Sequence, residues 1–353
     1  MRIIGNLVVL LAIFIIGFSG LVSAANKVPT ENVPEWVVER ADIEGSLLFS
    51  DSPETVNEDG ILYSDTVSGK VRLLYYHVNG MDLPRKLAVI VENETGDPAD
   101  ITIDNYAIGG PSTDYLEVGK TTQQDYFGGK KVAFVHVSPH EQKLLLSELS
   151  NIKINTNQLV YGIVDFTSLK PIKVTVMMLP IKTDPLQFVK MAKVLPKDAC
   201  RLRGTFAGMN RIVRAKQIYN PDKDGIVGIT LADGKQDQFR TGIDATDGSI
   251  VQNTGNYGVL YKIQVPIAKN KKLRYYLNPR GGYYAGAVTI SDALRGQRRM
   301  IQTPLDKPFF SNNSLSEIEY LGEYGSDDET CLEFSPPGAS NLPVRLILTP
   351  DDY

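Results

Sequence analysis

From Gly60 onward the chain alternates between short runs of β-branched and aromatic residues and clusters of turn residues, and no stretch keeps a long helical period. Runs of this length, bounded by Gly, Asn, Asp and Pro, are typical of antiparallel strands in a sandwich. We expect only a turn of helix near 291–296, and 141–150 is compatible with either a short helix or a strand and turn. The sequence therefore predicts an all-β fold built from antiparallel Ig-like or jelly-roll-like β-sandwiches. The clearest runs lie at 71–78, 86–92, 100–104, 131–137, 159–166, 172–178, 226–231, 257–265, 273–277, 285–290 and 344–348.

Prolines divide this series into two parts. Pro180, Pro185 and Pro196 interrupt the strand pattern, and a chain of this length commonly forms two domains of about 150 residues each. We expect a first sandwich over 46–182, a proline-rich hinge over 183–198 and a second sandwich over 199–353. Residues 25–45 are polar, lack a period and are expected to form a linker.

The N-terminus has the three parts of a secretory signal. Arg2 gives a positive start, an apolar stretch runs over 7–18, and Val22-Ser23-Ala24 forms a small-residue cleavage site. We expect cleavage after residue 24 and a secreted or cell-surface protein. The alternative is a retained membrane anchor, because the apolar stretch is almost long enough to span a bilayer. After cleavage no second long apolar run remains, so we expect no membrane span.

The charge of the exported chain argues against one class of partner. Removing 24 of the 353 residues removes one arginine and leaves 36 basic and 41 acidic side chains, a net charge of −5. Nucleic-acid binding depends on clustered Lys and Arg that displace counterions. We therefore expect no nucleic-acid partner.

The two cysteines, Cys200 and Cys331, are expected to form a disulfide. An even number of cysteines in an oxidising compartment favours pairing. The alternative is a pair of buried free thiols, which behave as small apolar side chains.

One loop resembles half of a calcium site. Asn220, Asp222 and Asp224 offer oxygen atoms at alternate positions before Gly225, as in the first half of a calcium loop. The position where a bidentate Glu is required holds Leu231, and an ordinary turn explains Pro, Asp and Gly equally well. We therefore expect no cofactor, with calcium at this loop as the alternative.

Tyrosine is unusually frequent, with 17 residues that include adjacent pairs. Tyrosine rings on an open sheet face stack on sugars and bond through their hydroxyls, although adjacent side chains in a strand point to opposite faces, so that one ring of each pair belongs to the core. An arginine cluster nearby offers contacts to an anionic polymer, or is simply a solvated loop. The candidate ligand-binding residues are Tyr275, Tyr283, Tyr284, Arg295, Arg298 and Arg299.

Several strings together are similar to a known group of proteins. They are Glu58-Asp59-Gly60-Ile61-Leu62-Tyr63-Ser64-Asp65-Thr66, Tyr76-His77-Val78-Asn79, Arg203-Gly204-Thr205-Phe206 and Asn256-Tyr257-Gly258-Val259-Leu260-Tyr261. Over 45–353 the chain resembles secreted Bacillota β-rich proteins of unassigned activity, which accompany copper-amine-oxidase N-terminal-like (stalk) domains. The resemblance implies an exported surface or matrix protein and carries over no catalytic residue.

Three functions stay open. The first is a non-enzymatic cell-surface or matrix protein that binds cell-wall polysaccharide or a surface protein, which fits export, the β architecture and the tyrosines. The second is a carbohydrate-active hydrolase with an unrecognised carboxylate pair, since carboxylates are numerous although nothing singles out two of them. The sequence contains no G-x-S-x-G, H-E-x-x-H or P-loop motif, which favours the first function. The third is a structural, self-assembling matrix subunit. No catalytic residue is singled out, and an enzyme is the less favoured reading.

Overall fold

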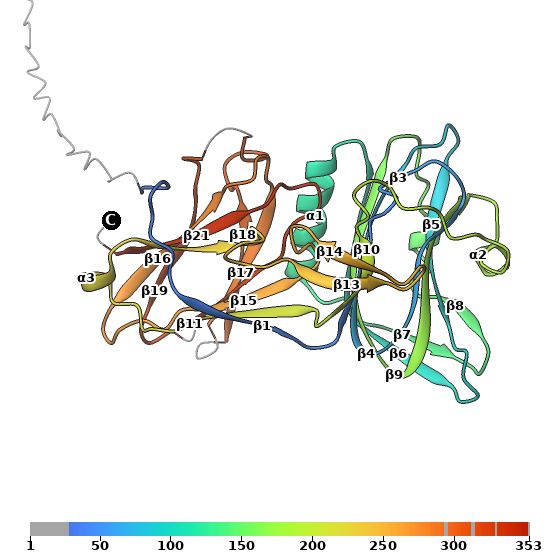
Figure 1. Cartoon of the computed structure of the whole chain (residues 1–353), viewed down its shortest axis with the longest axis horizontal. Helices are drawn as coiled ribbons and strands as arrows, with labels where there is room; N and C mark the ends of the chain where they lie inside the picture. Colours follow the sequence, from blue (N-terminus) through green and yellow to red (C-terminus); the bar gives the residue numbers. More distant parts are fainter. Residues whose placement is uncertain (1–27, 293–295, 312–314, 329, 352–353) are drawn as a thin grey trace, which may run out of the picture.

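The computed structural model describes residues 28–292, 296–311, 315–328 and 330–351. The expected signal peptide over 1–24 and Arg295 lie outside the described residues. The chain forms two lobes side by side along the long axis of the molecule, with α1 (Tyr115–Gly128) between them (Figure 1). No helix among the described residues is long and apolar enough to cross a membrane.

The first lobe is built on an eleven-stranded sheet. Its two longest strands, β4 and β9, pair along most of their length, and β9 changes partner midway: residues 159–168 pair with β6, whereas residues 173–180 pair with β5. Strand β9 therefore connects β4 to β6 along its first half and to β5 along its second half. The strands follow the order β14 (Ser249–Asn253), β13 (Arg240–Asp244), β10 (Arg203–Ala207), β2 (Ser46–Ser50), β4 (Gly60–Asn79), β9 (Leu159–Pro180), β5 (Arg85–Glu92) and β8 (Gln142–Leu144), with β3 (Thr55–Val56) on β4, β6 (Ala99–Ser112) on β9 and β7 (Ala133–Val137) on β6.

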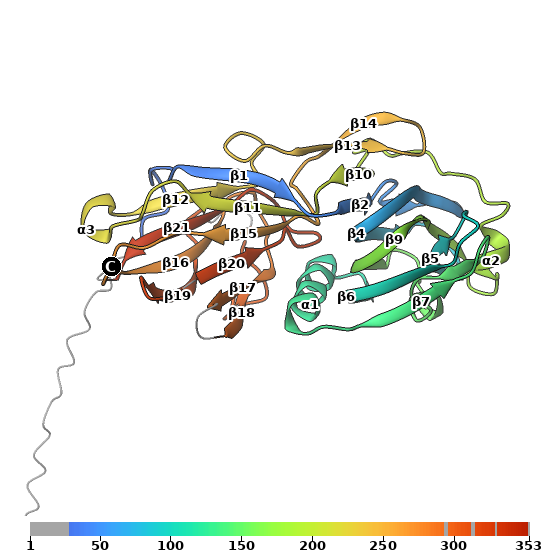
Figure 2. The ribbon, with the colours of Figure 1, turned by 90° about the horizontal axis from the view of Figure 1, so that it is seen from below.

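The second lobe contains a six-stranded and a four-stranded sheet (Figure 2). The larger sheet has the order β1 (Val38–Ile43), β11 (Asn210–Ala215), β15 (Leu260–Gln264), β20 (Thr330–Phe334), β17 (Gly286–Asp292) and β18 (Gln297–Thr303). The smaller has the order β12 (Val227–Leu231), β21 (Val344–Pro350), β16 (Lys272–Pro279) and β19 (Glu319–Gly325). The short helical segments are η1 (Leu149–Asn151), α2 (Pro185–Phe188) and α3 (Pro221–Asp224).

The all-β fold of antiparallel-rich sheets is confirmed, with two differences in detail. The pairs β2–β4, β3–β4 and β11–β15 are parallel, and the 14-residue helix α1 was not predicted. The stretch 141–150 holds the short strand β8 and the start of η1, so it is mainly strand and turn.

The lobes do not follow the expected division of the sequence. Part of the predicted linker, 38–43, forms β1 and pairs with β11 in the second lobe. In return, β10, β13 and β14, which lie after the predicted hinge, extend the sheet of the first lobe. The chain therefore crosses between lobes at 43–46 and around 207–210, and again between β12 and β13 and between β14 and β15. The linker and both domain boundaries need this correction, because strand exchange between lobes leaves no local mark in the sequence.

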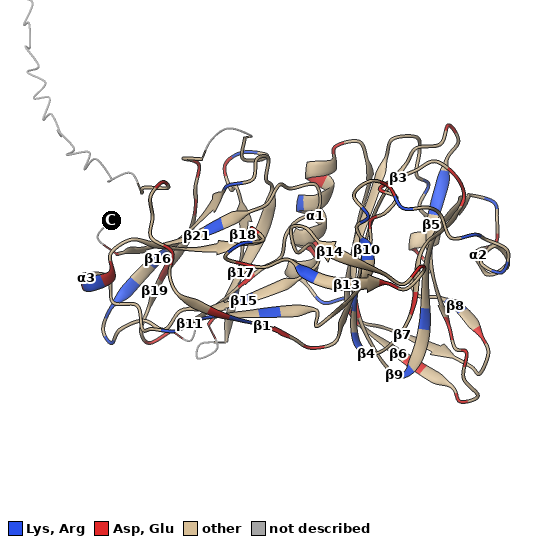
Figure 3. Ribbon diagram, viewed as in Figure 1, with Lys and Arg blue, Asp and Glu red and all other residues tan. Residues whose placement is uncertain are grey.

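The hydrophobic core is continuous between the lobes. One cluster fills the first lobe and includes Leu73, Val164 and Phe166. A larger cluster begins with Phe49 and Leu74 on the first lobe, includes residues of α1 and extends through the second lobe. Lys, Arg, Asp and Glu are interspersed along both lobes (Figure 3).

Candidate functional site

A pocket lies where the two lobes meet, and it combines aromatic rings with carboxylates. Strands β2, β4 and β9 of the first lobe form one side, and loops before β10, β15 and β21 form the other. Its cavity volume is about 150 Å³. We call it the tyrosine–carboxylate pocket; its lining residues are Phe49, Asp51, Glu54, Leu74, Tyr76, Tyr161, Leu202, Tyr257, Gly338 and Ala339.

Three tyrosines form the aromatic part of the wall. The rings of Tyr76 and Tyr161 meet edge to face, with their centroids 5.8 Å apart. Gly338 packs against both rings, since a Cβ there would lie 3.2 Å from ring atoms of each. Tyr257 comes from the second lobe, and its hydroxyl donates to the carbonyl of Ser340 at 2.7 Å. The rings are therefore held in place before any ligand arrives.

Two carboxylates, Asp51 and Glu54, reach the pocket from the loop between β2 and β3. The Asp51 Oδ1 atom is buried and has no hydrogen-bond partner among the described residues. Burial, reinforced by the nearby charges of Glu54 and Asp198, raises the pKa of Asp51 well above its usual range. Burial and then Asp198 also raise the pKa of Glu54. The ionised forms of both groups therefore lack a compensating cation among the described residues.

Asp198 fixes the loop that carries these carboxylates. It accepts hydrogen bonds from the Ser52 hydroxyl at 2.9 Å, from the Glu54 backbone N–H at 2.8 Å and from the N–H groups of Cys200 and Arg201, each at 3.0 Å. Burial alone would raise the pKa of Asp198, but these hydrogen bonds outweigh it and hold the pKa below the ordinary value. Both carboxylate oxygens of Asp198 are therefore already used in hydrogen bonds that hold the loop.

His77 supports the same loop from within the first lobe. Its Nδ1 lies 2.9 Å from the carbonyl of Pro53, and its Nε2 lies 2.9 Å from the Ser50 hydroxyl. A carbonyl only accepts, so Nδ1 carries the proton and Nε2 accepts from Ser50. Complete burial lowers the pKa of His77 to about 4. The imidazole is therefore neutral, and it supports the loop that carries the carboxylates.

Arg72 joins the two lobes beside Tyr257. Its guanidinium makes two 2.7 Å hydrogen bonds to Asp165 of the first lobe. The remaining donor atom Nη1 reaches the second lobe, at the carbonyls of Met209 at 3.0 Å and Gly258 at 3.1 Å. Because Gly258 follows Tyr257, this contact sets the position of the ring relative to the first lobe.

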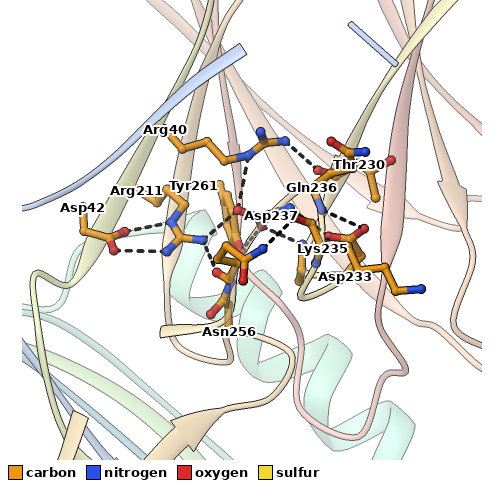
Figure 4. Close-up of polar contacts among 12 residues, drawn as sticks. Arg40, Asp42, Arg211, Thr230, Asp233, Lys235, Gln236, Asp237, Asn256 and Tyr261 are labelled. Carbon is orange, nitrogen blue, oxygen red and sulfur yellow. Dashed lines mark hydrogen bonds and ion pairs between the residues drawn. The ribbon is translucent and has the colours of Figure 1, made fainter. Parts of the chain in front are cut away.

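A second buried cluster, centred on Asp237, holds the segment that leads into Tyr257 (Figure 4). The fully buried carboxylate of Asp237 contacts Arg211 at 2.7 Å and Arg40 at 3.3 Å, and it accepts from the Tyr261 hydroxyl at 2.7 Å. The Tyr261 hydroxyl in turn accepts from the Asn256 amide at 2.8 Å. Asn256 directly precedes Tyr257, so this cluster positions the pocket from the side of the second lobe.

The predicted tyrosine platform is corrected by burial. Tyr275 and Tyr284 are 2% and 0% exposed and, unlike the equally buried Tyr161, do not line the tyrosine–carboxylate pocket. Tyr283 is 43% exposed and packs against Phe309. As expected from strand alternation, one ring of each of these two pairs belongs to the core, and the partner of Tyr275 is the half-buried Tyr276, whose ring packs at a tilt against Tyr320.

The described arginines of the predicted cluster, Arg298 and Arg299, have different surroundings. Arg298 lies over the Phe127 ring, donates to the Phe127 carbonyl and pairs with Glu333 at 3.3 Å. Arg299 is exposed on β18. Neither lines the tyrosine–carboxylate pocket.

The candidate calcium residues have local partners. The Asn220 side chain caps α3 by accepting from the Asp222 N–H, Asp224 accepts from the Asn220 N–H at 2.6 Å, and Asp222 pairs with Lys271 at 2.5 Å. Among the described residues, no group of three or more acidic, His or Cys side chains is arranged to hold a metal ion. The segment forms a capped helical turn, and calcium binding there stays a prediction.

The expected disulfide is wrong. Cys200 and Cys331 are both free thiols. Cys200 lies beside Asp198 in the loop that enters β10, whereas Cys331 pairs with Ser291 in the sheet of the second lobe. Because β10 belongs to the first lobe and β20 to the second, the two cysteines lie in different lobes.

Sequence reasoning missed the residues that form the pocket. Asp51, Glu54, Tyr161 and Tyr257 lie in different strands and loops, and only the meeting of the lobes brings them together. The one available signal was the resemblance strings, because two of them contain Tyr76 and Tyr257.

Comparisons with known proteins add no family. No protein-family model matches the chain, and no curated protein matches it. Among solved structures, the chain is similar to the N-terminal CBM22 tandem domain of a Paenibacillus barcinonensis protein, with a TM-score of 0.18 and 10% identity over 91% of this chain and 99% of that one. It is also similar to vicilin from Corylus avellana, with a TM-score of 0.12 and 9% identity over 88% and 86% of the two chains. At such scores these likenesses carry no argument.

Proposed function

We propose that this chain is an extracytoplasmic, non-enzymatic protein that binds a cell-wall polysaccharide, with one sugar unit of the polymer held in the tyrosine–carboxylate pocket. The observation that carries the proposal is the convergence of Tyr76, Tyr161 and Tyr257 with Asp51 and Glu54 in one concavity between the lobes. Aromatic faces pack against the apolar faces of sugar rings, and carboxylate and phenol oxygens bond to their hydroxyls.

The size of the pocket limits what it can hold. Sites for drug-sized ligands commonly have about 300–1,000 Å³, and this pocket is smaller, at about 150 Å³. It therefore suits one ring-sized unit, such as a chain end or a side branch, rather than several consecutive sugars. The signal sequence expected at the N-terminus and the resemblance to secreted Bacillota proteins support a partner outside the cytoplasm.

The carboxylates favour binding over hydrolysis. A glycosidase needs two carboxyl groups with opposed roles, one protonated and one ionised. Asp51 and Glu54 both have raised pKa values, and they belong to the same short loop. Asp198, whose pKa is lowered, is occupied by four hydrogen bonds from the backbone and Ser52. No pair with opposed roles is therefore open to substrate among these three groups.

Retention on purified Gram-positive cell walls tests the proposal. The wild-type protein should sediment with the walls, and Tyr257→Ala should lose most of this retention because it removes one wall of the pocket. The matched control is Tyr320→Ala, which removes a tyrosine that is 45% exposed on β19 and lies outside the pocket. Circular dichroism verifies that both variants fold. Equal retention of the two variants, or no retention of the wild type, would contradict the proposal.

A glycoside hydrolase is the second candidate, favoured by the raised pKa of Glu54 inside the same pocket. Release of reducing ends from wall polysaccharide distinguishes the two functions. Binding without release is the expected result. Release that Glu54→Gln abolishes would establish the hydrolase instead.

A further inference from the structure

We infer that the tyrosine–carboxylate pocket selects a sugar unit that carries an ammonium group, so that its ligand is an amino-bearing polysaccharide rather than a neutral one. This inference rests on the proposed function and narrows it to one class of ligand. It follows from the charge of the pocket, from its unpartnered polar atoms and from its aromatic walls.

The charge of the pocket is uncompensated. Asp51 and Glu54 are its ionisable acids, and no Lys, Arg or His is among the described residues that line it. Asp198 lies behind the same loop and adds a third negative charge. Elsewhere in this protein the buried carboxylates Asp237 and Asp244 each contact an arginine. Glu54 is exposed, whereas Asp51 is partly buried and its Oδ1 atom is inaccessible to solvent. A buried carboxylate oxygen without a cation is costly, so the missing partner of Asp51 is expected to come from the ligand.

Two buried polar atoms mark where a donor would bind. The Asp51 Oδ1 atom is buried and has no hydrogen-bond partner among the described residues, and the buried Tyr161 hydroxyl has only the Gly338 backbone beside it, without a hydrogen bond of standard geometry. The Tyr161 side chain is 1% exposed, and its ring lines the pocket. An ammonium group has three N–H donors, whereas a sugar hydroxyl has one. A single ammonium can therefore serve Asp51 and still bond to a second oxygen.

The aromatic walls favour the same group. Tyr76, Tyr161 and Tyr257 surround the carboxylates, and cations are attracted to the faces of aromatic rings, most strongly where water is excluded. Burial, together with the charges of Glu54 and Asp51, raises the pKa of Tyr76. The tyrosines consequently stay neutral at physiological pH and add no charge of their own. A neutral sugar would leave the repulsion between the carboxylates in place, whereas an ammonium group relieves it.

Three disaccharides provide the direct test by calorimetric titration at near-neutral pH. Diglucosamine carries an ammonium on each ring, N,N′-diacetylchitobiose carries a neutral amide at the same position, and cellobiose carries a hydroxyl. Diglucosamine should bind the wild type at least about tenfold more tightly than either neutral sugar, which is the scale of one desolvated cation–π contact. Asp51→Asn and Glu54→Gln should each abolish this preference.

The matched control is Glu39→Gln, which removes one exposed carboxylate on β1 and should leave the preference unchanged. Should a carboxylate variant fail to fold, the wild type alone still decides, because its affinity for tetramethylammonium should fall as the pH is lowered and Asp51 and Glu54 become protonated.

The outcomes separate this inference from the function on which it rests. Equal binding of all three disaccharides, lost in Tyr257→Ala, would overturn the ammonium preference and leave the sugar-binding pocket in place. A preference for diglucosamine that persists in both carboxylate variants would overturn the inference, because the selectivity would then arise elsewhere. If no disaccharide binds and cell walls do not retain the protein, both proposals fail.

Discussion

Acid should destabilise this protein through one buried histidine. His77 is fully buried and neutral, with its pKa lowered from 6.5 to about 4 by burial. At a pH between these two pKa values, the unfolded chain binds a proton at His77 that the folded protein does not bind. The stability that is present above pH 6.5 is therefore lost as the pH falls towards about 4. At about 1.4 kcal/mol per pKa unit, the loss amounts to about 3 kcal/mol.

Urea unfolding from about pH 7 to about pH 4, with the wild type and His77→Gln compared at each step, measures this loss. The comparison is needed because Asp51 and Glu54 act in the opposite direction. Their raised pKa values mean that they gain stability as the pH falls. Glutamine supplies an amide donor and acceptor for the contacts to Pro53 and Ser50 but does not titrate.

The wild type should exceed the variant in stability at neutral pH, and this difference should shrink by about 3 kcal/mol across the range. A difference that is independent of pH would refute the reasoning. It would show that His77 is already protonated in the folded state or is not buried there.

Three further predictions concern the junction and the thiols. Arg72→Met should lower the free energy of unfolding in urea by about 3–5 kcal/mol, because it leaves Asp165 without its cationic partner. Lys170→Met, which breaks an exposed ion pair with Asp97, should lower it by less than about 1 kcal/mol. Equal effects of the two variants would refute the role of Arg72. Gly119→Ala should lower thermal stability by about 1–3 kcal/mol, because a Cβ would lie 1.9 Å from the Gly338 carbonyl oxygen, while Gly128→Ala at the end of α1 meets nothing within 4 Å and should be tolerated; unchanged stability of the first would contradict this packing. Thiol titration should find two free thiols, the exposed Cys200 reacting before Cys331, whose pKa burial raises to about 11; an absence of reactive thiol after denaturation would restore the disulfide.

The strands were predictable because their signal is local. Alternation and β-branched residues located β5 and β21 within one or two residues of their observed ends. Helix α1 had no such signal, since its sequence contains Thr121, Thr122 and Gly119, which are weak helix formers. Tertiary contacts hold it instead: Gly119 packs on Gly338, and Gln123 bonds to the backbone of Ser335 and Ala287.

The candidate site was less predictable than the fold. Asp51 and Glu54 sit in a loop that resembles any polar turn, and their environment depends on residues more than a hundred positions away, such as Asp198 and Tyr257. The expected domain boundaries also hid the junction, because β1 and β10 cross it. The tyrosine count pointed to the right residue type, but the packing of the two lobes determines which rings line the pocket.

Ring-selective NMR of protein labelled with ¹³C-tyrosine tests the central claim most directly. On titration with diglucosamine, the resonances of Tyr76, Tyr161 and Tyr257 should shift together, while those of the surface rings Tyr283 and Tyr320 stay in place. Shifts confined to Tyr283 and Tyr320 would place the ligand on the outer sheet faces and contradict the account of the pocket.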